Sequence, residues 1–319
     1  FLLGLYKLRL MSKPLQKLFD MRALRRNRQR AAASYEKFSY LKDEAALRLA
    51  DRVDLMRRDF DICLDLGSHD GRLRQHLAPL NKIRTIVHSD PAANFSYNFL
   101  PNSMSPIAAP FAVHDFSVLP FADASFDAVF SCLNLHWVDD LPGLILQIRR
   151  TLRPDGLCLI NLLGGNSLFE LRAALIAAEQ DITGGSSPRC APMADIRDIG
   201  GLLARAGLAL PVADSDRLTV TYPNMFQLMM DLRGMGEQNA LLGRLRNPTK
   251  RTVFLRAAEI YRDKFGQADG LIPASFEIIT LTGWAPHDNQ QKPLRPGSAK
   301  IRLATAIGSN EIDPESTGL

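Results

Sequence analysis

The segment from Ile62 to Gly71 constrains the fold of this chain more than any other. An apolar run, Ile62-Cys63-Leu64-Asp65-Leu66, ends in the turn Gly67-Ser68-His69-Asp70-Gly71, and a helical pattern follows to about Leu80. Further buried, strand-like runs follow at 83–88, 126–131 and 157–163, with helical stretches between them. Strands that alternate with helices at this spacing form βαβ units. We therefore predict an α/β fold with a parallel sheet covered on both faces.

The second half of the chain is predicted to be more helical. Residues 167–179 and 193–206 read as helices, and residues 214–221 and 276–283 as strands that could pair at one edge of the sheet. Two more helical stretches, 223–235 and 252–265, exceed what a minimal α/β domain needs and indicate an inserted cap. We divide the chain into four parts: a basic N-terminal arm (1–40), a nucleotide-binding core (41–165), the rest of the sheet with its helical cap (166–286) and a flexible tail (287–319).

The positive charge of the chain is concentrated at its N-terminus. Residues 1–30 hold nine Lys or Arg against Asp20, a net charge of +8, and the other 30 basic and 33 acidic residues leave −3. A slightly acidic body argues against a nucleic-acid enzyme. The arm could contact an anionic membrane, act as a targeting sequence or form a solvated helix face. Because the chain opens with Phe1, Met11 could be the true start, or residues 1–10 could end a transit segment.

Two other classes of protein are excluded by the sequence. No run of 18 apolar residues occurs, so no transmembrane helix is predicted. The four cysteines are widely spaced without a Cys-x-x-Cys pair, which argues against a disulfide framework or a zinc site. We expect buried thiols in a reducing compartment.

The glycine turn after the first strand is the strongest candidate for a ligand site. Gly67 and Gly71 let a ligand approach the backbone at a helix N-terminus. A dinucleotide fingerprint would need glycine where the chain has His69 and Arg72, so that interpretation fails. Asp65 would repel a diphosphate and attract a cation, and a sulfonium or ammonium ligand fits better.

Two further acids follow the next strands. Asp90 lies 25 residues after Asp65, where a carboxylate can accept both hydroxyls of a ribose. Asp115, next to Phe116, could accept a hydrogen bond from an adenine amino group. One acid at a strand end is ordinary, but three beside a glycine turn favour a nucleoside crevice.

At these residues the chain resembles the class I S-adenosylmethionine-dependent methyltransferases. Asp65-x-Gly67-x-His69-x-Gly71 is similar to their first motif, and Leu152-Arg153-Pro154-Asp155-Gly156 is similar to their turn into the fifth strand. Asp90 matches their ribose acid, and Asp115 matches their adenine contact. The resemblance covers about residues 41–165 and implies a mostly parallel sheet with one antiparallel edge strand, and S-adenosylmethionine as cofactor. His69 departs from it, because the family has glycine there.

A narrower resemblance is to the mitochondrial complex I assembly factor 5 family and its bacterial relatives. Four segments carry it: Phe38–Glu44, Leu135–Pro142, Gly164–Arg172 and Tyr222–Glu237. The family keeps the methyltransferase fold and is known as a protein-arginine hydroxylase. The resemblance therefore implies an enzyme that modifies an iron–sulfur subunit of respiratory complex I. It also implies a location in the cytoplasm or the mitochondrial matrix. There the basic arm could make a peripheral contact with the inner membrane.

On the substrate side, His136 and Trp137 follow the fourth strand at the edge where ligands bind in such sheets, although a structural role for His136 is as well supported. Four methionines (Met225, Met229, Met230 and Met235) favour a core helix over a substrate-facing lid. The only His-x-Asp pair, His88-Ser89-Asp90, uses the ribose acid, so no metal site is predicted. Two alternatives stay open: a methyltransferase acting on a small molecule or carrier protein, and a non-enzymatic assembly chaperone.

Overall fold

The computed structural model describes residues 17–99 and 109–290, together with residues 298, 301, 305, 306 and 308. Contacts divide the chain into two units, 1–286 and 287–319, and the fold below is that of the first. The expectations for residues 1–10, for Met11 and for most of the tail lie outside the described residues.

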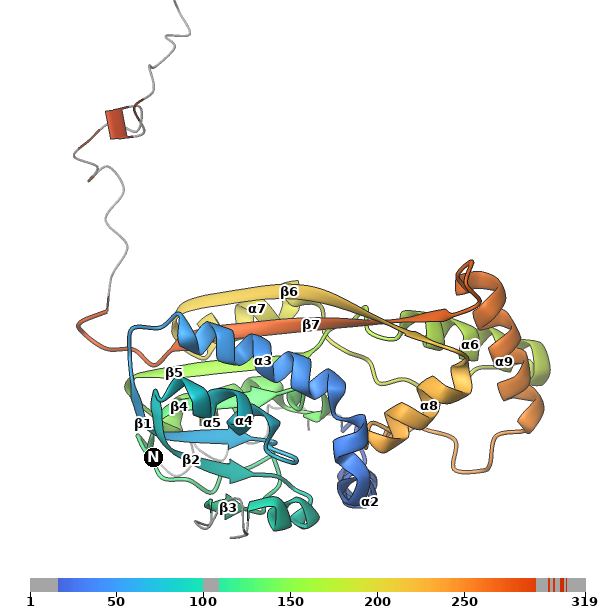
Figure 1. Cartoon of the computed structure of the whole chain (residues 1–319), viewed down its shortest axis with the longest axis horizontal. Coiled ribbons are helices and arrows are strands. Elements are labelled where there is room, and N and C mark those ends of the chain that lie inside the picture. The colour runs from blue at the N-terminus through green and yellow to red at the C-terminus, as the bar shows by residue number, and fades with distance from the viewer. Residues whose placement is uncertain are drawn as a thin grey trace, which may run out of the picture. The chain divides into compact units, whose positions relative to one another are not determined.

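A seven-stranded sheet in the order β3-β2-β1-β4-β5-β7-β6 forms the centre of this unit (Figure 1). Strands β1 to β5 pair in parallel, and β7 pairs antiparallel with both β5 and β6. This confirms the predicted fold class, with one refinement: the antiparallel strand is second from the edge, because β6 pairs along its outer side. The strands are β1 (Phe60–Leu66), β2 (Ile83–Ser89), β3 (Phe111–Ala112), β4 (Phe126–Cys132), β5 (Leu152–Leu163), β6 (Ala209–Tyr222) and β7 (Ile272–Trp284).

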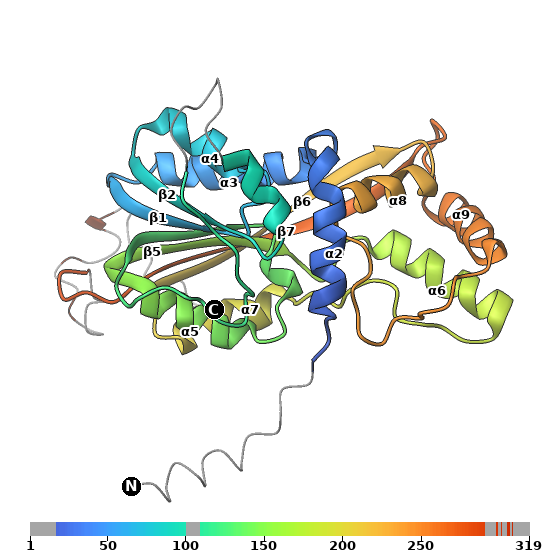
Figure 2. The same ribbon diagram turned by 90° about the horizontal axis from the view of Figure 1, so that it is seen from below.

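Helices cover both faces of the sheet, as the uninterrupted apolar strands predict (Figure 2). On one face α3 (Tyr40–Asp54) and α4 (Arg72–Leu77) pack against side chains such as Cys63. On the other face α5 (Leu141–Thr151) and α7 (Ile196–Arg205) pack against alternate residues of the same strands, such as Leu64. Short 3₁₀ helices span Ala32–Phe38 (η1), Ala78–Leu80 (η2), Ala93–Phe99 (η3) and Leu135–Trp137 (η4).

Three helices form the cap beyond the carboxyl end of β5. They are α6 (Phe169–Thr183), α8 (Met225–Gly234) and α9 (Arg251–Phe265), and they share one apolar cluster with α3 and the ends of β6 and β7. The methionines divide between two roles: Met225 and Met235 are buried in this cluster, whereas Met230 is exposed.

The basic N-terminal segment is not a free arm where the structure describes it. Helix α2 (Met21–Ala31) lies between the sheet and the cap helices (Figure 2), and Asp20 caps it by accepting from the amide of Ala23. Leu24 is buried against Trp137 and neighbouring apolar side chains. Arg22, Arg25, Arg26 and Arg30 are exposed, but Arg28 is fully buried. The boundary at residue 40 stays a prediction, although residues 17–40 clearly contribute to the core.

The predicted thiol chemistry agrees with the structure. All four cysteines are free; Cys63, Cys132 and Cys158 are buried and Cys190 is half-buried. Burial raises the pKa of the Cys132 thiol to about 12, which leaves it protonated and unreactive. Among the described residues, no helix is both long and apolar enough to cross a membrane.

Candidate functional site

The turn between β1 and α4 has a conformation that requires glycine. Gly67 and Gly71 have φ angles of 82° and 83°, in the left-handed region, and His69 joins them there at 49°. The amide of Gly67 donates to the carbonyl of Ser89 at 2.8 Å, which ties the turn to the end of β2. A Cβ atom on Gly67 would lie only 2.2 Å from the Asn134 side chain. The turn is therefore closely approached from β4.

The three predicted acids lie at the carboxyl ends of three neighbouring strands. Asp65, at the end of β1, is buried, and its Oδ2 lies 3.2 Å from Nδ1 of His88. Asp90, directly after β2, is fully buried, and its Oδ1 accepts from the amide of Ala92 at 2.8 Å. Asp115, beyond β3, is half-buried and accepts from the amide of Ser117. The structure thus gathers the acids at one edge of the sheet.

His69 is buried beside Asp90 rather than turned to solvent. Its Nδ1 lies 2.6 Å from the Lys42 ammonium and 3.6 Å from Oδ2 of Asp90, and its ring stacks on Tyr35. Burial, together with the charges of Lys42 and Arg28, holds the pKa of His69 well below its usual value. A neutral imidazole therefore accepts from Lys42 and lies beside the Asp90 carboxylate.

Arg28 is a component of the crevice that lies far from it in the sequence. Its guanidinium is fully buried, 3.7 Å from Oδ2 of Asp90 and over the ring of Phe116, 5.7 Å from the centroid. None of its three nitrogens has a hydrogen-bond partner among the described residues. Burial raises the pKa of Asp90, and the Arg28 charge opposes that rise. Helix α2 therefore closes the crevice with a cation.

Unpaired buried polar atoms are concentrated around this turn. Folded proteins pair nearly all such atoms with protein groups, water or a ligand, so a cluster of exceptions identifies a candidate binding site. Acceptors from the acids and donors from Arg28 would suit the ribose hydroxyls, amine and carboxylate of S-adenosylmethionine. The unpaired atoms are Nε, Nη1 and Nη2 of Arg28, Oδ1 of Asp65 and of Asp70, Nε2 of His88 and of His114, Oδ2 of Asp90, both side-chain atoms of Asn134 and Nδ1 of His136.

His136 and Trp137 lie on η4, after β4, and share one carboxylate. Nε2 of His136 is 3.1 Å from Oε2 of Glu237, and the indole N–H of Trp137 donates to the same oxygen at 2.5 Å. Burial alone would raise the pKa of Glu237, but the His136 imidazole and the indole outweigh it and the net shift is downward. The pair predicted from sequence is thus held by an anion from the loop after α8.

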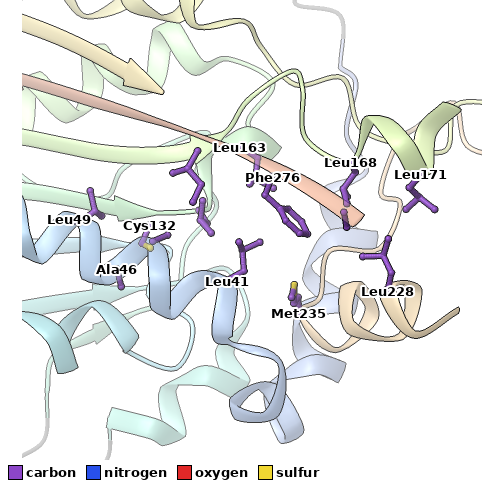
Figure 3. Packing of buried hydrophobic residues seen from close by; sticks show 14 of the residues in the cluster. Leu41, Ala46, Leu49, Cys132, Leu163, Leu168, Leu171, Leu228, Met235 and Phe276 are labelled. Carbon is purple, nitrogen blue, oxygen red and sulfur yellow. The ribbon is translucent and has the colours of Figure 1, made fainter. Parts of the chain in front are cut away.

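An apolar cavity of about 250 Å³ opens beside these residues, between α6, α8, α9 and the segment 189–193. Figure 3 shows Leu41, Met235 and Phe276, which line it, converging on the same space from three elements. A second, small hollow of about 20 Å³ adjoins Lys42 and His136. Four residues line both spaces: Leu41, Leu163, Met235 and Glu237. The two spaces therefore adjoin near Lys42, whose ammonium donates to the carbonyl of Gly67 in the glycine turn.

Comparison with known proteins gives the family of this chain. A family model described as a methyltransferase domain matches residues 64–160. "Arginine-hydroxylase NDUFAF5, mitochondrial" of Danio rerio is 37% identical over 301 residues, which cover 93% of this chain and 92% of that protein. The chain belongs to the NDUFAF5 family. This confirms the resemblance seen in the sequence and places the chain in the class I S-adenosylmethionine-dependent methyltransferase superfamily.

A second relative of this chain is named as a methyltransferase. The "Malonyl-[acyl-carrier protein] O-methyltransferase" of Xylella fastidiosa is 34% identical over 272 residues, covering 84% of this chain and 89% of that protein. A solved structure from Bacillus halodurans, assigned provisionally as a methyltransferase, aligns with a TM-score of 0.52 at 16% identity. The alignment covers 76% of this chain and 99% of that one, and it bears on the fold alone. Both relatives by sequence are named as enzymes, which places this chain among the enzymes of the superfamily.

Sequence reasoning missed four residues of the site. Arg28, Lys42, Asn134 and Glu237 all contact or approach the predicted residues. A signal existed for Lys42, because it adjoins the apolar stripe of α3 and is buried with it. No local pattern distinguishes Arg28 from the other arginines of α2, since only the packing of that helix buries it.

Proposed function

We propose that the chain binds S-adenosylmethionine in the crevice of Asp65, Gly67, His69, Gly71 and Asp90, with Asp115 and Phe116 at the adenine end. The observation that supports this most strongly is the concentration of unpaired buried acceptors and donors at the turn. Such atoms are costly unless a ligand completes them. When bound, the cofactor would supply an activated methyl group on a sulfonium centre.

We further propose that the enzyme hydroxylates an arginine side chain of a partner protein, the iron–sulfur subunit of respiratory complex I. The support is the match over 93% of this chain to a relative named as an arginine hydroxylase. His136 and Trp137, beside the apolar cavity, would line the substrate side. The described residues include no cluster of three His, Cys, Asp or Glu side chains able to hold a metal ion, and the proposal assigns none.

The location of the enzyme is part of the same proposal. Its relatives are named mitochondrial, and we place this chain in the matrix or, in a bacterial host, in the cytoplasm. The exposed arginines of α2 (Arg22, Arg25, Arg26 and Arg30) would provide a peripheral contact with an anionic membrane.

Mass spectrometry of the complex I iron–sulfur subunit tests the activity. In a strain that lacks this chain, we expect one arginine of that subunit to lack one oxygen atom, and expression of the intact chain to restore it. A subunit with unchanged mass and normally assembled complex I would contradict the proposed hydroxylation.

Methyl transfer is the second candidate, because the Xylella relative matches most of both chains. Incubating the purified protein with methyl-labelled S-adenosylmethionine and a cell extract distinguishes the two. Label in a carrier protein or small molecule would favour methyl transfer; its absence, with the oxygen lost in the deletion strain, would favour hydroxylation.

A further inference from the structure

Glu237 stands where the apolar cavity adjoins the small hollow next to Lys42, and one of its two carboxylate oxygens accepts no hydrogen bond from the residues that the structure describes. Oε2 accepts from both His136 and Trp137, whereas Oε1 accepts no hydrogen bond among the described residues. The side chain keeps 17% of its surface exposed and lines both the cavity and the small hollow next to Lys42. One carboxylate oxygen therefore remains available to a group that enters through the cavity.

The carboxylate is held in its charged form. Although burial opposes ionisation, the neighbouring His136 and the charge of Arg28 lower the pKa of Glu237 overall. A fixed anion at the inner end of an apolar passage selects a cation that carries its own hydrogen-bond donors.

The walls of the cavity suit the rest of such a ligand. Leu168, Leu171, Phe254 and Phe276 line it and provide contacts for a methylene stem. The Trp137 ring lines it as well, and indole is the side chain that attracts a cation best. A cavity that holds a single water has a volume of about 10–15 Å³. The cavity here, with about 250 Å³, is therefore large enough for one long side chain.

Other charges at the cavity do not cancel this preference. Arg189 is already paired with Glu179 at 2.7 Å, and Arg233 is exposed on the last turn of α8. Among the residues that line the cavity, Glu237 is the one acidic side chain within the described part of the chain.

We propose that Glu237 is the specificity residue that receives the guanidinium of a substrate arginine, whose stem lies in the apolar cavity. This inference rests on the proposed modification of arginine and adds the residue that recognises it. The bound guanidinium would then lie beside Trp137 and His136, where the cavity adjoins the small hollow next to Lys42.

Binding measurements on the full chain test the inference without any turnover. A short peptide with a central arginine is titrated calorimetrically into the wild-type protein, into Glu237→Gln and into Glu259→Gln, with S-adenosylhomocysteine present throughout. In Glu237→Gln the new amide oxygen would still accept from His136 and Trp137, but the negative charge would be gone. Glu259, exposed on α9 and outside the cavity, provides the matched control.

We expect Glu237→Gln to weaken arginine-peptide binding about 10- to 100-fold, the usual effect of losing one charged hydrogen-bond partner. Glu259→Gln should stay within about twofold of wild type. Wild-type protein should also bind the arginine peptide at least about 10-fold more tightly than the same peptide with citrulline, which keeps the shape but not the charge. Because that comparison uses only the wild-type protein, it tests the inference even if Glu237→Gln does not fold.

Equal binding of the arginine and citrulline peptides would overturn the inference, as would unchanged binding by a folded Glu237→Gln protein. Preferential binding of a malonyl-ester probe would overturn it in favour of an acidic ligand. If Glu237 discriminates between the peptides but the subunit from the deletion strain keeps its oxygen atom, the proposed hydroxylation is refuted and this inference stands. If the subunit loses its oxygen atom but binding shows no discrimination, the hydroxylation stands and this inference is refuted.

Discussion

The crevice and the cavity are neighbours with opposite chemistry. The crevice, around Asp65, Asp90 and Arg28, holds buried charges and unpaired polar atoms. The cavity under α8 is lined mainly by Leu, Met and Phe side chains. Buried charges without partners are destabilising, whereas an apolar hollow costs mainly lost packing. The difference supports the two proposals made above, a polar ligand among the buried charges and an apolar stem in the cavity.

The two spaces share one structural wall. Successive residues of α3 serve both sides: Leu41 faces the cavity, and Lys42 donates to the carbonyl of Gly67 in the cofactor turn at 2.6 Å. After α8, Met235 and Glu237 line both the cavity and the small hollow next to Lys42. The predictions below therefore change residues around the glycine turn, which line neither space, and leave the cavity intact.

The largest expected effect is on the crevice. Asp90→Ala removes the proposed acceptor of the ribose hydroxyls. Two charged hydrogen bonds contribute about 3–6 kcal/mol, so affinity for S-adenosylhomocysteine should fall at least 100-fold. Calorimetry on protein shown to be folded by circular dichroism measures it. Asp90→Asn, which keeps the shape, should lose most of the same affinity. Asp263→Ala, exposed on α9, is the control. Retained binding in Asp90→Ala would show that the nucleoside lies elsewhere.

A smaller effect is expected at the turn. Gly67→Ala forces a Cβ into the left-handed region and against Asn134, and should lower the free energy of unfolding by about 2–3 kcal/mol. Gly185→Ala is the matched control, because no atom lies within 4 Å of a Cβ there, and it should stay within about 0.5 kcal/mol of wild type. Urea unfolding compares the two. Equal stability of both variants would mean that the turn tolerates a side chain.

The same contrast explains what the sequence could predict. The sheet, its crossovers and the acids at the strand ends follow from local patterns: apolar runs of strand length, a glycine turn and the spacing from Asp65 to Asp90. These features depend on residues near one another in the chain. The patterns predict that the last two strands pair at one edge of the sheet, but not that β7 lies between β5 and β6. That order depends on the long return of the chain through the cap.

The residues that the sequence could not provide come from distant segments. Arg28 reaches Asp90 across 62 positions of the chain, and Glu237 reaches His136 across 101. Neither belongs to a motif with a physical mechanism, and both depend on how α2 and α8 pack on the sheet. Net charge placed Arg28 in a basic arm whose role the sequence left open, and tertiary packing buries this arginine completely.

The smallest expected effect is on pH dependence, and it belongs to the crevice alone. Burial and the Lys42 charge lower the pKa of His69, so below about pH 6.5 the unfolded chain gains a proton that the folded chain excludes. The neutral His69 therefore costs no stability above that pH. As the pH falls below it, the free energy of unfolding decreases by up to about 1.4 kcal/mol per pH unit.

His69→Asn, which tolerates the positive φ, should flatten this slope between about pH 5 and 6.5, whereas His287→Asn, exposed in the second unit, should leave it unchanged. Burial raises the pKa of Asp90, and the stability from that carboxyl changes in the opposite sense, falling as the pH rises. Only the difference between wild type and His69→Asn in thermal unfolding therefore isolates the imidazole. A slope that persists in His69→Asn would mean that this imidazole titrates freely, and that the crevice is open to water before its cofactor arrives.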